Sequence, residues 1–269
     1  MATQQVLAVD VGNSRAKFGL FEIGAAAVPQ VVAVSALRLA EPAAPADVLA
    51  TWLTSLNAQP ARAILAGSNP PVRDQLLHAW PADAAQPGVV LSAADVPVPL
   101  DVDQPATVGI DRLLTAYAAS RIFATGQPVI VVDSGTATTI NLVTHEGVFR
   151  GGSIFPGLRL SAHALHDYTA RLPLIDTDAI ADKVSETEAP IPGRSTEQAM
   201  ISGLFWGQLG AIRELRARLA RVAMGQYKEA QDPVCLVTGG GGRQLSEHLL
   251  PCFYVDSLAL HGLALLASD

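Results

Sequence analysis

The chain has 269 residues, of which 49% are hydrophobic, and a formal net charge of −7 at pH 7. This length and composition allow one large domain or two smaller ones, each with a buried core. Because no basic run offsets the acidic balance, the charge argues against nucleic acid or an anionic membrane surface as the main partner.

The first half of the chain alternates between strand-like and helix-like patterns. Strands are predicted at 6–9, 15–21, 28–34, 62–66 and 89–91, and helices at 47–56, 71–80 and 109–123. Asp47 is the expected N-cap of the first helix. The proline-containing stretch 96–105 reads as a loop.

The second half repeats this alternation. An antiparallel meander is predicted from strands at 129–132, 138–143 and 148–154, and a helix follows to about residue 168. The segment 173–192 looks irregular. Further strands are expected at 234–237 and 253–255, and helices at 195–224, 243–250 and 258–266. The helix from 195 is apolar around much of its first half, which is typical of a core or subunit-interface helix.

No targeting or membrane-spanning segment is expected. The N-terminus lacks a basic, apolar leader, and no segment reaches the roughly 18 uninterrupted apolar residues of a membrane span. Cys235 and Cys252 fit buried thiols in a reducing compartment better than a disulfide framework. We therefore expect a soluble, cytoplasmic protein.

One short pattern occurs twice, near the start and near the middle of the chain. Asp10-Val11-Gly12-Asn13-Ser14 and Asp133-Ser134-Gly135-Thr136-Ala137 each follow a β-branched apolar run and precede an alternating segment. Each copy reads as a strand, a tight glycine turn and a second strand. A duplicated hairpin-plus-α/β unit is the economical interpretation.

These turns suit phosphate and its cation, because a glycine turn presents backbone N–H groups beside a carboxylate. Asp10 is a candidate magnesium ligand, and Gly12 lets the chain approach phosphate. Asn13 and Ser14 can hydrogen-bond phosphate, and Lys17 adds positive charge. An ordinary Asx turn would explain the first copy alone. The second copy, with hydroxyls on Thr136, Thr138 and Thr139, favours a nucleotide site.

Two further segments carry candidate chemistry. The stretch from Thr238 to Gly242 lies between a predicted strand and a helix, and reads either as a flexible loop or as the floor under an adenosine. Asp111 and Arg112 lie at a predicted helix start, where an aspartate is favoured by the helix dipole alone. If both face a cleft, Arg112 clamps an anion and Asp111 accepts a proton from an attacking hydroxyl.

Taken together, these segments resemble a known family. The two aspartate turns resemble the phosphate motifs of the acetate and sugar kinase/Hsp70/actin superfamily. The whole set resembles type III pantothenate kinase, in this order: V-G-I-D-R at 108–112, D-S-G-T-A-T-T at 133–139, G-G-S-I-F-P-G-L at 151–158, G-R-S-T-E-Q-A-M-I-S-G at 193–203 and T-G-G-G-G at 238–242.

The resemblance implies a fold and a reaction. The fold is α/β, with two similar ribonuclease H-like domains of the actin-like ATPase type, at 1–125 and 126–269, mixed β-sheets and a nucleotide cleft between them. The reaction is ATP-dependent phosphorylation of pantothenate to 4′-phosphopantothenate, the opening step of coenzyme A synthesis. Mg²⁺, a monovalent cation (K⁺ or NH₄⁺) and a homodimer with its substrate site near the subunit interface are also implied.

The resemblance also implies residue roles. Asp111 is the implied proton acceptor, Asp133 the ligand of the monovalent cation and Asp10 a candidate magnesium ligand. Residues implied to bind ATP are Asp10, Val11, Gly12, Asn13, Ser14, Arg15, Ala16, Lys17 and Thr136. Residues implied to bind pantothenate are Gly109, Ile110, Asp111, Arg112 and Thr196, the last from the partner subunit.

This sequence departs from the family pattern at one point of the substrate loop. Val102 stands where family members often carry a tyrosine, which leaves the aromatic wall of the substrate pocket unassigned. Two alternatives to a pantothenate kinase remain. One is a sugar kinase of the same superfamily, and the other is a non-catalytic ATP-binding regulator.

Overall fold

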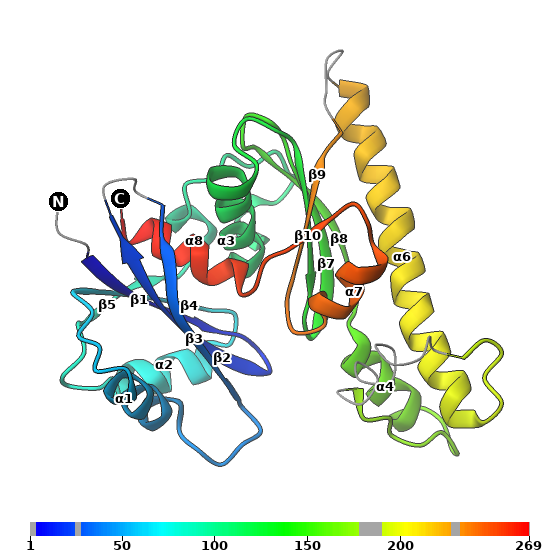
Figure 1. The fold of residues 1–269 in the computed structure, drawn as a ribbon, viewed down its shortest axis with the longest axis horizontal. Coiled ribbons are helices and arrows are strands. Elements are labelled where there is room, and N and C mark those ends of the chain that lie inside the picture. The colour runs from blue at the N-terminus through cyan, green and yellow to red at the C-terminus, as the bar shows by residue number, and fades with distance from the viewer. Residues whose placement is uncertain (1–3, 25–27, 178–189, 227–231, 269) are drawn as a thin grey trace. The chain divides into compact units, whose positions relative to one another are not determined.

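The structure is a computed structural model and describes residues 4–24, 28–177, 190–226 and 232–268. The chain divides into two compact units (Figure 1). Unit 1 comprises Met1–Thr125 together with Ser257–Asp269, and unit 2 comprises Gly126–Asp256. Each unit is built around its own five-stranded sheet.

The sheet of unit 1 has the strand order β3-β2-β1-β4-β5. β1, β2 and β3 pair antiparallel, whereas β4 and β5 continue the sheet in parallel from β1. The elements of unit 1 are β1 (Gln4–Val11), β2 (Arg15–Ile23), β3 (Gln30–Arg38), α1 (Pro45–Ser55), β4 (Arg62–Gly67), α2 (Pro70–His78), β5 (Pro87–Val90), α3 (Ile110–Ala118) and α8 (Leu258–Leu266).

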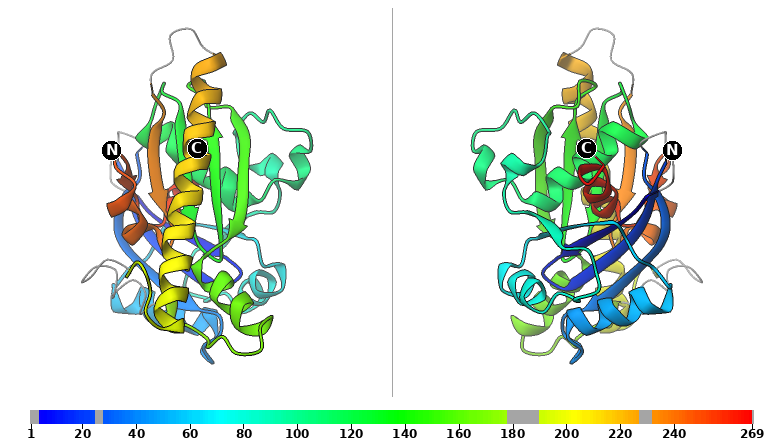
Figure 2. Two further views of the ribbon diagram at one scale, coloured as in Figure 1. Left: turned by 90° about the vertical axis from the view of Figure 1, so that its right-hand side faces the viewer. Right: turned by 90° about the vertical axis from the view of Figure 1, so that its left-hand side faces the viewer.

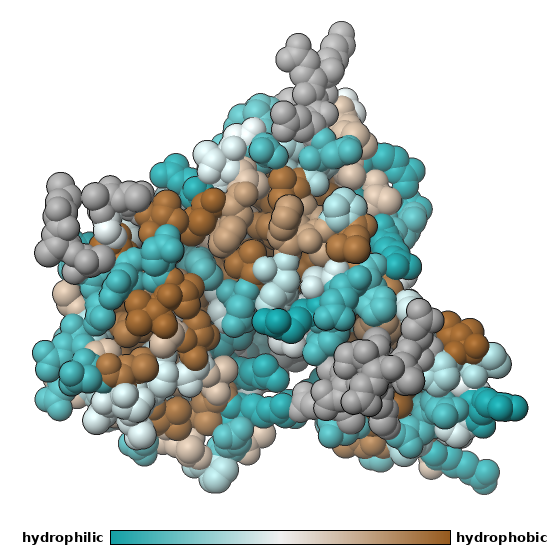
Figure 3. All heavy atoms as spheres, viewed as in Figure 1, coloured by the Kyte–Doolittle hydropathy of each residue, from teal (hydrophilic) through white to brown (hydrophobic). Residues whose placement is uncertain are grey.

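Helices cover both faces of this sheet. Leu7, Val9 and Val11 of β1 share a core with residues of α1 and α2, whereas α8 packs on β1, β2 and β4 from the other side and α3 packs on α8. A strand covered on both faces has no solvent side, and this explains why β1 is a continuous apolar run. Solvent-exposed apolar side chains gather instead on β3, at Val31, Val32 and Val34 (Figure 3).

Unit 2 repeats the topology of unit 1. Its strand order β8-β7-β6-β9-β10 matches β3-β2-β1-β4-β5 element for element, with the same three antiparallel and two parallel strands. Its elements are β6 (Val129–Ser134), β7 (Ala137–Val143), β8 (Phe149–Pro156), α4 (Leu158–Asp167), α6 (Thr196–Gln226), β9 (Val234–Thr238), α7 (Gly242–His248) and β10 (Phe253–Tyr254). The predicted duplication and the predicted α/β fold with mixed sheets are therefore confirmed.

The core of unit 2 lies between its sheet and α4, α6 and α7. Ile130 and Val132 of β6 and Ile140 of β7 pack there against Phe205 and Leu209 of α6. Figure 2 shows α6 running along the strands of this sheet. The apolar character of the first half of α6 is therefore explained by this core along one of its faces.

The predicted elements agree closely with the structure, and the exceptions have local causes. Asp47 is not the N-cap: α1 begins at Pro45 after Ala44, because proline is pre-organised for the first helical position, and Asp47 lies in the first turn. The helix predicted at 109–123 ends as α-helix at Ala118 and continues as a π-helical turn, Ala119–Phe123. Of the irregular segment at 173–192, residues 178–189 lie outside the described residues.

The C-terminal helix belongs to unit 1, although the predicted domain ranges group it with the second half of the chain. Gly262 lets α8 approach α3 closely, since a Cβ at this position would overlap the carbonyl oxygen of Leu114. Across residues 4–24, 28–177, 190–226 and 232–268, no helix is long and apolar enough to cross a membrane.

We expect Gly262→Ala to lower the free energy of unfolding by about 1–3 kcal/mol, because the added methyl group pushes α8 away from α3. Gly88→Ala in β5 is the matched control, since its Cβ meets only the carbonyl oxygen of Ala63 at 3.9 Å. Denaturant unfolding of both variants measures the difference. Equal stability of the two variants would contradict the close packing of α8 on α3.

Candidate functional site

The first turn joins β1 to β2 and brings Asp10 opposite Lys17. The backbone N–H of Gly12 donates to the carbonyl oxygen of Arg15 at 2.9 Å and closes the turn. Asp10 and Lys17 are paired across the antiparallel ladder, and residues paired in this way point to the same face with Cβ atoms about 4.5–5.5 Å apart. The turn therefore presents a carboxylate and an ammonium group side by side.

This pair of charges fits a magnesium-bound phosphate. Mg²⁺ is usually held by one or two carboxylates together with substrate phosphates, and a lysine contributes a compact positive charge to phosphate. Asp10 and Lys17 are both partly exposed, and Asn13 at the tip of the turn is exposed. The residues of the first turn are thus chemically suited to the predicted ATP site.

The side of the sheet on which Asp10 lies is fixed by the pleat. Successive strand residues alternate between faces, and Leu7, Val9 and Val11 face the core of α1 and α2. Asp10 therefore faces the side that carries α8, and α3 packs on that side against α8 and β4. Asp10 and helix α3, which carries Asp111 in its first turn, therefore lie on the same side of this sheet.

Asp111 lies in the first turn of α3, directly after the extended N-cap residue Gly109 and Ile110. Its Oδ1 accepts a hydrogen bond from the backbone N–H of Arg112 at 2.9 Å. Both side chains are half-buried. Burial lowers the pKa of the Arg112 guanidinium, and the charge of Asp111 opposes this shift. The helix start thus carries a carboxylate and a guanidinium on adjacent residues, and the geometry is compatible with either predicted role of Asp111.

The threonines of the second turn differ in solvent exposure. Thr136 is exposed at the tip, whereas Thr138 and Thr139 are buried. The buried Thr139 Oγ1 accepts a hydrogen bond from Asn141 Nδ2 at 3.1 Å. Of these three threonines only Thr136 is exposed, and it is the one that the resemblance selects for ATP.

The second turn is also shorter than the first and lacks its lysine. Val11 pairs with Ala16 across the first turn, whereas Ser134 pairs with Thr138 across the second. Asp133 pairs with Thr139, in the place where Asp10 has Lys17. The two aspartates therefore have different partners, which fits different ligands.

The four glycines at 239–242, here called the glycine tetrad, pack against the second turn. Thr238 pairs with Asp133 across the parallel strands β9 and β6, and the N–H of Gly241 donates to the carbonyl oxygen of Ser134 at 3.0 Å. Gly239 has a φ of +89°, and a Cβ there would overlap Asp133 Oδ1. Only glycine combines this backbone conformation with this approach. The tetrad is therefore an ordered neighbour of Asp133 and not a detached flexible loop.

A residue that the sequence reasoning missed supports the second turn. Gln208 of α6 is 6% exposed, and its Nε2 donates to Ser134 Oγ at 3.1 Å and to Thr138 Oγ1 at 2.7 Å. The available signal was a lone amide on the apolar face of a helix, between Phe205 and Ile212.

Thr196 is the first residue of α6 and is exposed. The preceding residue caps the helix, since Ser195 Oγ accepts from the N–H of Gln198 at 3.2 Å. The Gln198 side chain accepts in turn from the N–H of Arg194 at 2.8 Å. This arrangement, similar to a capping box, fixes the helix start and leaves the Thr196 side chain accessible.

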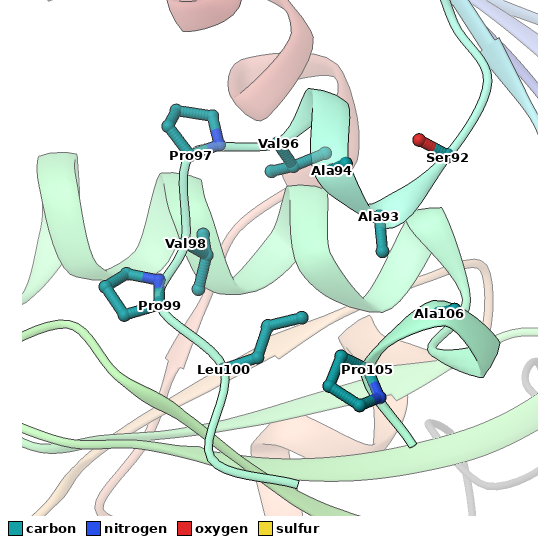
Figure 4. Close-up of a pocket in the computed structure, with 10 residues that line it drawn as sticks. All are labelled: Ser92, Ala93, Ala94, Val96, Pro97, Val98, Pro99, Leu100, Pro105 and Ala106. Carbon is teal, nitrogen blue, oxygen red and sulfur yellow. The ribbon is translucent and has the colours of Figure 1, made fainter.

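A pocket of about 610 Å³ lies in unit 1, just ahead of Gly109 in sequence. Figure 4 shows the lining residues on the loop that precedes α3. Ser92 supplies the one side-chain hydroxyl of the lining, and the other residues are alanine, valine, proline and leucine: Ala93, Ala94, Val96, Pro97, Val98, Pro99, Leu100, Pro105 and Ala106. The pocket offers an aliphatic surface.

The family model for type III pantothenate kinase matches residues 6–218 of this chain. The chain belongs to the type III pantothenate kinase family. This match spans both aspartate turns, the start of α3 and the start of α6. The family suggested by the sequence motifs is therefore confirmed.

Full-length relatives agree with this assignment. A type III pantothenate kinase of Desulfovibrio desulfuricans is 34% identical, over 94% of this chain and 95% of the relative. Another from Chlorobaculum parvum is 32% identical, over 97% of this chain and 93% of the relative. A crystal structure described as a conserved putative Baf family transcriptional activator from Campylobacter jejuni is similar with a TM-score of 0.57 at 20% identity, covering 97% of this chain and 96% of that one.

Proposed function

We propose that this type III pantothenate kinase family member catalyses the ATP-dependent phosphorylation of pantothenate to 4′-phosphopantothenate, the first step of coenzyme A biosynthesis. The observation that carries the proposal is the pairing of Asp10 with Lys17 on one side of the unit 1 sheet. The same side carries α3, which has Asp111 in its first turn. A phosphate-binding turn and a candidate proton acceptor are what phosphoryl transfer to a hydroxyl requires.

In this proposal, unit 1 supplies the first set of contacts to both substrates. The residues of the first turn, from Asp10 to Lys17, bind the ATP phosphates, and Asp10 holds Mg²⁺, which neutralises charge on the transferred phosphoryl group. Asp111 orients the primary hydroxyl of pantothenate and accepts its proton. Gly109, Ile110 and Arg112 line the pantothenate site, with Arg112 as the partner for the substrate carboxylate.

Unit 2 supplies the remaining contacts. Thr136 joins the ATP phosphates, and Asp133 binds a monovalent cation, K⁺ or NH₄⁺. The absence of a lysine opposite Asp133 supports this separate role, because an ammonium side chain there would occupy the place of the cation. We further propose that the two units correspond to the two predicted ribonuclease H-like domains, and that the protein is cytoplasmic.

The aliphatic pocket at 92–106 supports an assignment for the missing aromatic wall. Pantothenate carries a geminal dimethyl group next to its reacting hydroxyl, and aliphatic side chains provide a surface for it. We propose that this pocket replaces the aromatic residue expected at Val102. Valine, proline and leucine side chains of the loop then contact the dimethyl group while Asp111 contacts the hydroxyl.

The test is an ADP-release assay with candidate acceptors, run with and without K⁺. We expect turnover with pantothenate and Mg-ATP, with no comparable turnover on hexoses. Turnover on a hexose but not on pantothenate would identify a sugar kinase instead. No acceptor-dependent turnover, together with a gel shift of DNA at physiological salt, would support a non-catalytic regulator, which the net charge of −7 disfavours.

We also propose a homodimer in which Thr196 is contributed to the partner subunit. Gly203, Gly207 and Gly210 follow one face of α6, opposite its buried face. Within the described part of the chain, and leaving aside the chain neighbours and the nearby backbone of α6 itself, no atom lies within 4 Å of a Cβ added to any of them. Each interior glycine weakens a helix by about 1 kcal/mol relative to alanine. Close approach by a second copy of α6 would offset this cost.

Gly207→Arg is expected to shift the protein toward monomer, because a long charged side chain on this face blocks close helix packing. Light scattering coupled to size exclusion measures the mass. Leu91→Arg is the control, since Leu91 is 60% exposed in unit 1. A Gly207→Arg protein with the parental mass would argue against an interface on this face.

A further inference from the structure

The base of the second turn contains a buried polar network that the proposed reaction does not use directly. Both Nε2 hydrogens of Gln208 are donated, one to Ser134 Oγ at 3.1 Å and one to Thr138 Oγ1 at 2.7 Å. Ser134 is 2% exposed and Thr138 0% exposed. The amide thus ties α6 to both ends of the turn.

The network lies behind the turn. Ser134 and Thr138 alternate with residues of the opposite face, and they share the α6 face with Ile130, Val132 and Ile140. Asp133 lies on the other face of β6, beside the glycine tetrad. Gln208 therefore contacts Ser134 and Thr138, the pair that closes the second turn, from the face opposite to that of Asp133.

Unit 1 shows that this hairpin does not need polar support. At the matching place of the first turn, Val11 pairs with Ala16, and both belong to the apolar core of α1 and α2. The same strand–turn–strand unit therefore forms over aliphatic side chains. The hydroxyls and the amide of the second copy are therefore not required to form such a hairpin.

The network also carries an energetic cost. Gln208 Oε1 is buried and has no hydrogen-bond partner in the described structure, and an unsatisfied buried acceptor destabilises a fold. Ser134 makes a second connection, because its carbonyl oxygen accepts from the N–H of Gly241 in the tetrad. Ser134 therefore links α6, the second turn and the tetrad.

We propose that Gln208 is a positioning residue for phosphoryl transfer: its amide holds Ser134 and Thr138 so that Asp133 and Thr136 meet the monovalent cation and the nucleotide phosphates. This inference rests on the proposed function. Its action is confined to the second turn and the tetrad, so it affects the nucleotide and the cation and leaves pantothenate binding unchanged.

The test is Gln208→Met, which keeps the length of the side chain and removes both donors. We expect the KM for ATP and the K⁺ concentration for half-maximal activity to rise roughly ten- to hundredfold, as for other residues that orient a ligand shell. The KM for pantothenate is expected to stay at the parental value. Gln75→Met, at an exposed position of α2, is the control and should change none of these constants.

Parental constants in Gln208→Met would overturn the proposal. A uniform loss of activity that follows a fall in melting temperature would also overturn it, because the Gln208 amide would then contribute only to stability. A double-mutant cycle with Thr138→Val gives an independent measure. If the amide acts through this hydroxyl, the second substitution adds little to the first, whereas additive effects would refute the coupling.

An apolar replacement of the whole network tests the inference in a variant that is expected to fold as stably as the parent. Ser134→Val, Thr138→Ala and Gln208→Met together copy the aliphatic base of the first turn, which folds without polar groups. We expect this triple variant to be at least as stable as the parent, because the orphan acceptor is gone, and to share the ATP and K⁺ defect. A stable triple variant with parental constants would refute the inference.

Failure of the proposed function is distinguishable from failure of this inference. If the parent protein does not phosphorylate pantothenate, the proposed function fails, and Gln208 is then judged by calorimetric binding of Mg-ADP in the presence of K⁺. A tenfold weaker binding to Gln208→Met than to the parent would still support the positioning role. Equal binding to both would reject it.

Discussion

Asp111→Asn is expected to lower kcat for pantothenate phosphorylation by roughly 10²–10⁴-fold, the usual contribution of a positioned general base. An asparagine has the shape of the aspartate but no basic oxygen with which to take the proton of the attacking hydroxyl. Its Oδ1 can still accept the hydrogen bond from the N–H of Arg112 that aspartate accepts at 2.9 Å. The start of α3, and with it the binding of pantothenate, is therefore expected to remain intact.

Steady-state kinetics with both substrates measures this effect, and thermal unfolding with pantothenate reports binding. Asp103→Asn is the matched control, because it removes the same charge from an exposed position on the loop before α3. Full turnover by a folded Asp111→Asn protein would remove the catalytic assignment and leave Asp111 with its helix-dipole role alone.

Asp10→Asn is expected to lower kcat by roughly 10²–10³-fold at a fixed magnesium concentration, the range seen when one preorganised electrostatic group is lost from an active site. The substitution removes the hard oxygen charge on which the cation depends, while Lys17 opposite it keeps its positive charge. The half-saturating concentration of Mg²⁺ is therefore expected to rise.

Asp133→Asn tests whether the two turns bind different cations. It is expected to raise the K⁺ requirement and to leave the Mg²⁺ requirement at the parental value, because Asp133 pairs with Thr139 and lies against the glycine tetrad. Titrations of both cations against both variants measure this, with the exposed Asp83→Asn as control. An Mg²⁺ shift in Asp133→Asn as large as that in Asp10→Asn would mean that the two turns are duplicates in function.

Much of the fold could be predicted from local pattern. The apolar runs at 6–9 and 258–266 predicted a strand and a helix, and the structure has β1 at the first and α8 at the second. The repeated aspartate turn predicted the duplication, because each copy is a short, contiguous segment. The N-cap of α1 was mispredicted since two local signals compete there, a proline at 45 and an aspartate at 47, and proline starts the helix.

The candidate site was predictable only where its residues are contiguous. The segments from Asp10 to Lys17 and from Gly109 to Arg112 each indicate a chemistry in sequence, and both lie within the residues that the family model matches. Gln208 was not predictable, because its partners lie about seventy positions earlier in the chain. A glutamine on a helix has no local signal that names the strand it will meet.

The sequence by itself therefore determined the duplicated α/β plan, the two aspartate turns and the family. Only the tertiary structure decided which side chains pack beneath each turn. The length of each turn sets the register of its hairpin, and the pleat then sends alternate side chains to opposite faces. For this reason Lys17 lies opposite Asp10, Thr138 lies in the core, and a buried amide from α6 supports the second turn but not the first.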